Sequence, residues 1–257
     1  MTILVAIDDS ANAHSVVGVA RRIATLFGTS VEGVHVQEDG SGQRAAAIAD
    51  AANVPLRVRH GDVVSALRSE VKERDATALV IGTRVQREGP LPAGHVTLDL
   101  VSSLNRPIVV VPPHAADRPL RSVLVAVEGD GESHALSELY ERLGNRPVPE
   151  VIVLHIVEPS ELPPFSDSPV LEAEAFEREF MIRASHSVSA DPSLIRFEMR
   201  VGDAPSLVCK AAHELDADLV VMAWHRSLSA GHGRLVRAML SGTPVPIALV
   251  PIDADAH

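Results

Sequence analysis

The sequence predicts an α/β protein of two repeated domains, each an open five-stranded parallel sheet with helices on both faces. Five short apolar segments occur in the same order in both halves of the 257-residue chain, and the stretches between them carry helical spacing. A polar segment marked by prolines separates the halves. Strands that alternate with helices form parallel sheets covered on both faces. Ligands of such sheets bind beyond the carboxyl ends of the strands, so functional residues are expected there.

The internal repeat rests on five matched segments. Within the repeat, Gly61 and Gly82 are separated by the same number of residues as Gly202 and Ala223. The matching pairs are Ile3–Asp8 with Val123–Glu128, Val34–Val36 with Leu154–Ile156, His60–Asp62 with Val201–Asp203, Leu79–Gly82 with Val220–Ala223, and Arg106–Pro112 with Val245–Pro251.

Each strand is expected at a short β-branched or apolar run bounded by turn-forming residues. In the first half these are the run that ends at Ile7, the run around Val34, and the runs at Leu56–Val58, Ala78–Ile81 and Ile108–Val111. The stretches between them predict helices, for example at Ala13–Leu26 and Val63–Arg74.

The boundary between the predicted domains lies in the segment Pro112–Pro119. The first domain is expected at residues 1–115 and the second at residues 120–252. The second copy is longer because of an insertion at about Glu158–Ser187, which includes an acidic amphipathic stretch, Leu171–Phe180. This stretch is either a longer surface helix or a helix that binds a partner.

Two like domains in one chain are expected to pack about a pseudo-twofold axis, because an isologous contact uses the same surface of each copy. The final strands, Ile108–Val111 and Ile247–Val250, are the expected contact elements. The chain would then be a pseudo-dimer by itself, and a homodimer of whole chains stays open.

Charge and composition exclude several classes of partner. The net charge of −11 disfavours nucleic acid and anionic membranes. Residues 1–115 hold 12 of the 34 acidic and 11 of the 23 basic side chains, so almost all of the excess negative charge belongs to the second half. No apolar run approaches the roughly 20 residues that span a bilayer. Cys209 is the only cysteine, which excludes an intramolecular disulfide and fits a cytoplasmic location.

The first candidate loop follows the first strand of each repeat, at Asp8–Ser10 and Glu128–Asp130. An acid in this loop could accept a hydrogen bond from a ribose hydroxyl or a base edge. The alternative is that Asp9 or Ser10 caps the helix that follows.

The second candidate loop follows the fourth strand and is rich in cations, with Arg84, Arg87 and His95 in the first half and His225, Arg226, His232 and Arg234 in the second. Glycines ahead of a helix N-terminus can direct backbone N–H groups at a phosphate. The cations therefore indicate either an anion site or solvated surface charge.

These residues give the repeat its resemblance to the universal stress protein family, over nearly the whole chain twice. The resemblance implies a Rossmann-like, adenine nucleotide alpha hydrolase-like fold in each half. Nucleotide-binding members of that family hold ATP with an Asp after strand one, backbone after strand two, and a loop of the form G-x2-G-x9-G-[ST].

In the first half, Asp8 matches the acid, Val36 the backbone position, and Gly82 and Gly94 two of the loop glycines. Val85 replaces the remaining glycine, and His95 replaces the Ser or Thr. The nucleotide-binding residues that the resemblance implies are Asp8, Val36, Gly82, Gly94, His95 and Val96 in the first half, and Gly233 and Arg234 in the second.

The second half departs further from the family pattern. Glu128 replaces the Asp, Ala223 and Arg226 replace two glycines, and Arg234 follows Gly233 where the family has Ser or Thr. A lost glycine adds a Cβ where phosphate must approach the backbone. His95 and Arg234 could each substitute a charged donor for the lost hydroxyl.

The resemblance implies a stress-response binding or regulatory protein that binds ATP or another anionic nucleotide in the first domain, with a degenerate pocket in the second. The alternative is an interaction scaffold whose pockets have decayed, with a protein partner that the sequence does not name. An enzyme is not expected, beyond slow ATP hydrolysis at most.

Other chemistry-bearing residues indicate structural roles. His35 and His155 occupy equivalent strands and are expected to be scaffold positions rather than metal ligands. The sequence has no zinc-type His or Cys spacing and no P-loop. Cys209 is expected on a buried helix face.

Overall fold

The structure is a computed structural model. It describes residues 1–37, 42–83, 94–113, 115, 118–127, 149–157, 195–226 and 232–252, together with residues 175 and 178. The first half contains strands β1 (Thr2–Ala6), β2 (Ser30–Gln37), β3 (Leu56–His60), β4 (Ala78–Gly82) and β5 (Ile108–Val111), and helices α1 (Ala13–Phe27), α2 (Gln43–Ala51), α3 (Val63–Glu73) and α4 (His95–Ser103).

The described part of the second half repeats this order. It contains strands β6 (Ser122–Val127), β7 (Glu150–Val157), β8 (Ile195–Val201), β9 (Leu219–Trp224) and β10 (Ile247–Pro251), and helices α7 (Ala204–Glu214) and α8 (His232–Gly242). The predicted helix at Leu171–Phe180 lies outside the described residues, except for two isolated positions.

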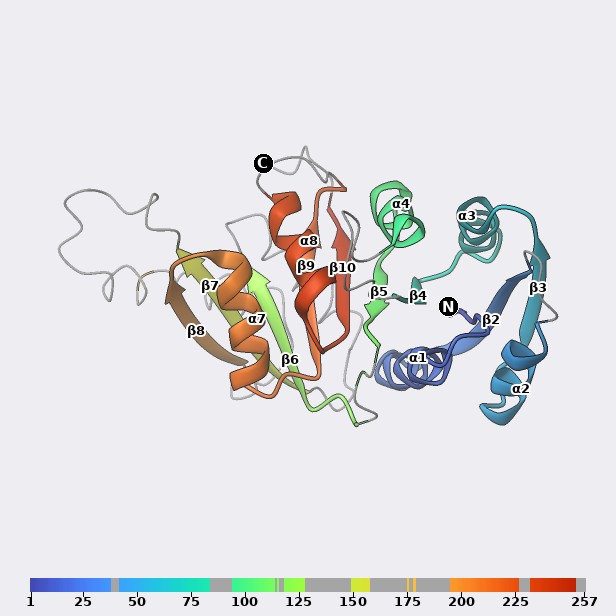
Figure 1. Ribbon diagram of the computed structural model, residues 1–257. Helices are drawn as coiled ribbons and strands as arrows, with labels where there is room; N and C mark the ends of the chain where they lie inside the picture. The colour runs from blue at the N-terminus through green and yellow to red at the C-terminus, as the bar shows by residue number, and fades with distance from the viewer. Residues whose placement is uncertain are drawn as a thin grey trace.

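All ten of these strands form one continuous sheet, in the order β3-β2-β1-β4-β5-β10-β9-β6-β7-β8 (Figure 1). Within each half the strands are parallel, and the first three lie in reverse order before the fourth and fifth. The predicted α/β fold class and the same strand order in both halves are therefore confirmed. In each half the strand order reverses beside the first strand, between β1 and β4 and between β6 and β9.

The two halves meet where β5 pairs antiparallel with β10, which confirms the prediction that the final strands are the contact elements. Ala248 pairs with Val109, and on either side Ile247 pairs with Val110 and Leu249 with Ile108. Residues 108–110 and 247–249 are equivalent in the repeat, so each contact has its reciprocal. This is the isologous pairing that a twofold axis requires.

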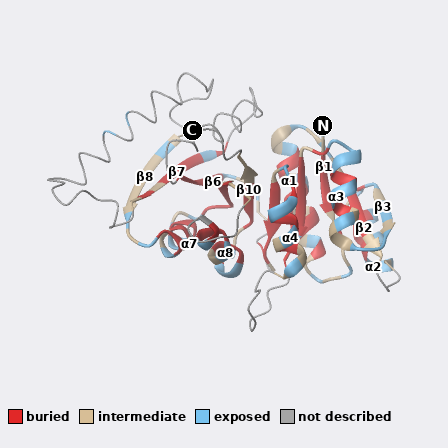
Figure 2. Cartoon of the chain, turned by 90° about the horizontal axis from the view of Figure 1, so that it is seen from above, coloured by how far each residue is buried: buried red, intermediate tan, exposed pale blue. Residues whose placement is uncertain are grey.

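Helices cover the sheet in two layers. Side chains of α3, α4, α7 and α8 share one buried cluster with one face of the sheet, and this cluster extends across both halves. Helices α1 and α2 pack on the opposite face of the first half. Figure 2 shows the central strands buried and the outer surfaces of the helices exposed. The edge strands β3 and β8 are only partly buried, because each has a neighbour on one side.

The repeated Gly-Asp pair makes the same strand-to-helix turn in both halves. Gly61 and Gly202 adopt positive φ angles of 102° and 147°, which glycine tolerates best. The next residue is the N-cap: Asp62 accepts a hydrogen bond from the Ser65 N–H, and Asp203 from the Ser206 N–H, at 2.8 and 3.1 Å. An Asp N-cap satisfies a helix donor that has no intrahelical partner.

Candidate functional site

The candidate site of the first half lies at the carboxyl ends of β1, β2 and β4, where the strand order reverses. Asp8 follows β1 and is partly buried. The Ile7 N–H donates to the Val34 carbonyl at 2.9 Å, so the pairing of β1 with β2 continues to the residue just before Asp8. Val36 is in β2 and packs against the core, and Gly82 is the last residue of β4. Three of the predicted residues thus lie on adjacent strand ends.

The Asp8 carboxylate is held in one orientation by Ser10. Its Oδ1 accepts hydrogen bonds from the Ser10 backbone N–H at 3.1 Å and from the Ser10 hydroxyl at 2.5 Å. A short loop of this kind, in which an Asp side chain bonds to the backbone two residues later, is an Asx-turn. The acid is therefore pre-oriented at the end of β1.

Asp9 has a role that sequence reasoning missed. Its Oδ1 accepts a hydrogen bond from the Ala45 N–H at 2.9 Å, in the first turn of α2. The expectation that Asp9 or Ser10 caps α1 is therefore wrong: the N-cap of α1 is Asn12. The cause is tertiary, because the loop after β1 lies beside the start of α2, whose own N-cap, Gly42, has no side chain to offer.

Asn12 connects α1 to the end of β5. Its Nδ2 donates to the Val111 carbonyl at 3.3 Å, and its backbone is helical, so its side chain turns away from the N–H groups of α1. The Oδ1 atom is buried and has no hydrogen-bond partner among the described residues. Nothing in the local sequence signals this contact, since Val111 lies 99 residues away.

Gly82 lies against the start of α1. A Cβ at this position would be 2.9 Å from Val16 Cγ2 and 3.2 Å from Asn12 Nδ2. Real Cβ atoms essentially never come as close as the first distance and rarely as close as the second. Helix packing therefore explains the glycine without any ligand, which is a reason that the sequence pattern did not reveal.

The start of α4 brings together Gly94, His95 and Val96. Gly94 is the N-cap with φ of 77°, His95 is exposed as the first helical residue, and Val96 packs partly against the core. Close by, the Ser65 backbone N–H lowers the pKa of Asp62, the N-cap of α3, and the positive charge of His95 adds to this effect. His95 therefore lies beside an acid.

The second half has the same arrangement with a stronger contact. Arg234 Nη1 is 2.9 Å from Asp203 Oδ1, so the guanidinium forms an ion pair with the N-cap of α7. The hydrogen bond from Ser206 is the main cause that lowers the pKa of Asp203, and Arg234 contributes. Gly233 is buried in the first turn of α8, which begins at His232. Thus the acid that caps α7 is a partner of Arg234.

Several predicted positions lie outside the described residues. They are Arg84, Val85 and Arg87 in the loop after β4, and Glu128–Asp130 in the loop after β6. The structure therefore compares the two halves at Gly82 and Ala223 and at the starts of α4 and α8, but does not describe Glu128 or most of either long loop.

The strand histidines have equivalent structural contacts, as expected of scaffold positions. His35 is buried and its Nδ1 lies 2.8 Å from the Ile7 carbonyl, to which it must donate because a carbonyl only accepts. His155 Nδ1 lies 3.4 Å from the Val127 carbonyl. Cys209 is half-buried with its Sγ 3.4 Å from the Met239 Sδ, and burial raises the pKa of its thiol.

The described residues offer neither a metal centre nor a membrane-spanning helix. No three His, Cys, Asp or Glu side chains gather into a metal-binding group among the described residues. No helix within that same part is both long enough and apolar enough to cross a membrane.

Comparisons with known proteins agree with this architecture. The model of the universal stress protein family matches residues 119–251. A universal stress protein from Archaeoglobus fulgidus DSM 4304 superposes with a TM-score of 0.68 at 13% identity, covering 99% of this chain and 97% of its own. A protein of unknown function from Pseudomonas aeruginosa PAO1 gives 0.67 at 17% identity, covering 98% and 92%. No curated protein matches the sequence. At these identities the structural likeness shows the fold, including its two-half arrangement.

Proposed function

Because this chain belongs to the universal stress protein family, we propose that it is a regulatory protein that binds an adenine nucleotide, with ATP as the expected ligand, in its first half. The proposal takes residues 1–115 and 120–252 as the two domains. The ligand would lie at the carboxyl ends of β1 and β4, and a conformational response to it would be read by a protein partner in the cytoplasm.

The observation that carries this proposal is the orientation of Asp8. Ser10 holds one carboxylate oxygen at the point where the strand order reverses, and ligands of open α/β sheets bind at such points. A pre-oriented acceptor loses little conformational entropy when a ribose hydroxyl or a base amine binds. Asp8 therefore suits the role that the family pattern assigns to its position.

The first half is preferred because the cation of the second half is already paired. Arg234 has Asp203 as its partner, so a phosphate would have to compete with a carboxylate 2.9 Å away. The excess negative charge of the second half also repels a nucleotide. His95 lies in the half that has almost no net charge.

Calorimetric titration of the full chain with ATP tests the proposal. Asp8→Asn keeps the shape of the side chain and removes its charge, so the affinity should fall about tenfold or more, as expected for a hydrogen bond to a charged group. Asp75→Asn is the matched control, because Asp75 precedes β4 and therefore lies on the side of the sheet where the strands begin, away from their carboxyl ends. Its affinity should equal that of the wild type.

Absence of heat with the wild-type chain would reject nucleotide binding and favour the interaction scaffold. Equal loss in both variants would show that the effect of Asp8→Asn is not local. Native mass spectrometry of protein purified from its own cell adds an independent result: a bound mass of a nucleotide is expected.

A further inference from the structure

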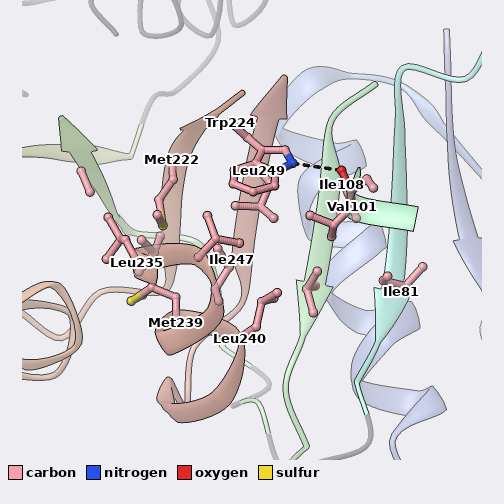
Figure 3. Packing of buried hydrophobic residues seen from close by; sticks show 14 of the residues in the cluster. Ile81, Val101, Ile108, Met222, Trp224, Leu235, Met239, Leu240, Ile247 and Leu249 are labelled. Atoms are coloured by element: carbon pink, nitrogen blue, oxygen red, sulfur yellow. Dashed lines mark hydrogen bonds between the residues drawn. The ribbon is translucent and has the colours of Figure 1, made fainter. Parts of the chain in front are cut away.

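Trp224 makes a side-chain contact between the two halves. It is the last residue of β9 and is 2% exposed. Its indole N–H donates to the Val101 carbonyl in α4 at 2.9 Å, across 123 positions of sequence (Figure 3). The ring packs in the buried cluster that includes Ile108 and Leu249, on the two strands that join the halves.

This contact breaks the pseudo-twofold symmetry of the chain. Trp224 follows Ala223 as Thr83 follows Gly82, and both residues are buried at the end of the fourth strand of their half. Val101 corresponds to Leu240 in α8. A threonine has no indole, so the indole hydrogen bond runs only from the second half to the first.

The acceptor lies at the carboxyl end of α4. The last four carbonyl groups of a helix lack intrahelical partners, and Val101 is the third residue from the end. This is the negative end of the helix dipole, where a donor is favourable. The positive end of the same helix, about 13 Å away for nine residues, begins at His95 beside the proposed nucleotide site.

We propose that α4 couples the nucleotide site of the first half to Trp224, so that occupancy of the site changes the contact between the halves. This inference rests on the proposed function. A phosphate near the start of α4 and the indole N–H near its end both stabilise the same helix position, because each complements the dipole at its end. By linkage, each then strengthens the binding of the other by the same factor.

The backbone of Trp224 is hydrogen-bonded as well as its side chain. The Ile252 N–H donates to the Trp224 carbonyl at 3.0 Å, which fixes the backbone of Trp224 next to β10. Two residues later, Arg226 adopts a positive φ of 59°.

The chain reports on this contact without labelling, because Trp224 is its only tryptophan. Titration of the full chain with ATP should change the tryptophan emission, and the change should saturate at the same concentration as the calorimetric heat. Trp224→Phe keeps an aromatic ring and removes the N–H. It should weaken ATP binding about three- to tenfold, while far-UV circular dichroism shows that the variant is folded.

Asp8→Asn separates an effect at the first half from direct contact of ATP with the tryptophan. In this variant the emission change should shift to higher ATP concentration together with the heat. An emission change that Asp8→Asn leaves at the wild-type concentration would mean that ATP binds beside Trp224, and would overturn the coupling.

The remaining outcomes are also decisive. Heat without an emission change, or an unchanged affinity in Trp224→Phe, would overturn the coupling and leave the proposed function standing. No heat in the wild type would overturn the proposed function, and the coupling with it.

Discussion

His95 and Arg234 occupy the same place in the repeat, and each lies beside the aspartate that caps the neighbouring helix. A cation at a helix N-terminus is normally unfavourable, because it meets the positive end of the dipole. Asp203 removes this cost for Arg234 through an ion pair. Asp62 lies close enough to His95 that the positive charge of His95 helps to lower the pKa of Asp62. The cations therefore do not by themselves require an anionic ligand.

At this scale, His95 predicts a contribution of its ring N–H to nucleotide binding. A hydrogen bond from this side chain to a charged phosphate should make His95→Ser bind ATP about three- to tenfold more weakly than the wild type. Calorimetry measures the two affinities. Equal affinities would mean that His95 only faces water and Asp62.

Gly82 predicts a packing effect that is separate from binding. In Gly82→Ala the new Cβ would lie 2.9 Å from Val16 Cγ2, so the free energy of unfolding should fall by about 1–3 kcal/mol. Urea denaturation measures this. Adding Val16→Ala makes room for the Cβ, so the double variant should lose less stability than the sum of the two single changes. Strict additivity would show that the two side chains do not meet.

Among the elements, the edge strands are tied to helices by ion pairs that recur in the repeat. Arg59 of β3 contacts Glu73 of α3, and Arg200 of β8 contacts Glu214 of α7, each at 2.8 Å. Charged side chains also discourage other chains from pairing with an exposed strand edge. The same residues therefore hold α3 and α7 against the edge strands and prevent other chains from pairing with β3 and β8.

A related pair, between Glu32 of β2 and Arg74 after α3, predicts a pH dependence of stability. The hydrogen bond from Arg74 lowers the pKa of Glu32 below its ordinary value of 4.5. A lowered folded-state pKa gives stability that is complete above the unfolded value and is lost as the pH falls through the folded value. Glu32→Gln should thus be less stable than the wild type at pH 7, by about 1 kcal/mol or less.

Thermal unfolding between pH 7 and pH 3 measures the difference. The difference between the two melting temperatures should vanish as the pH falls through the folded-state pKa of Glu32, which lies below 4.5, because the wild-type carboxylate then takes up its proton. A difference that is constant over this range would show that the ion pair is not its cause.

For the whole molecule, the joining of β5 to β10 uses the surface by which two separate domains would pair. The remaining edges, β3 and β8, carry charged side chains. The chain should therefore be a monomer of about 27.3 kDa in light scattering at micromolar concentration. A mass near twice this value would show that another surface, such as a strand edge, pairs whole chains.

The sequence alone predicted the architecture. The strand positions and the α/β class follow from hydrophobic periodicity and turn residues, which act over a few neighbouring positions. The pairing of the final strands follows from the internal repeat and the twofold symmetry that it implies. Asp8 at the end of β1 follows from the same local pattern. These features survive in the structure because the central strands must be buried whatever the long-range contacts are.

The partner that each polar side chain takes depends on the tertiary structure. Asp9 accepts a hydrogen bond from the Ala45 N–H of α2 instead of capping α1, Arg234 pairs with Asp203, and Trp224 donates to a carbonyl 123 positions away. A side chain with several acceptors or donors within reach takes the one that the packed elements bring to it. That choice depends on strand order and helix position, which no short stretch of sequence contains.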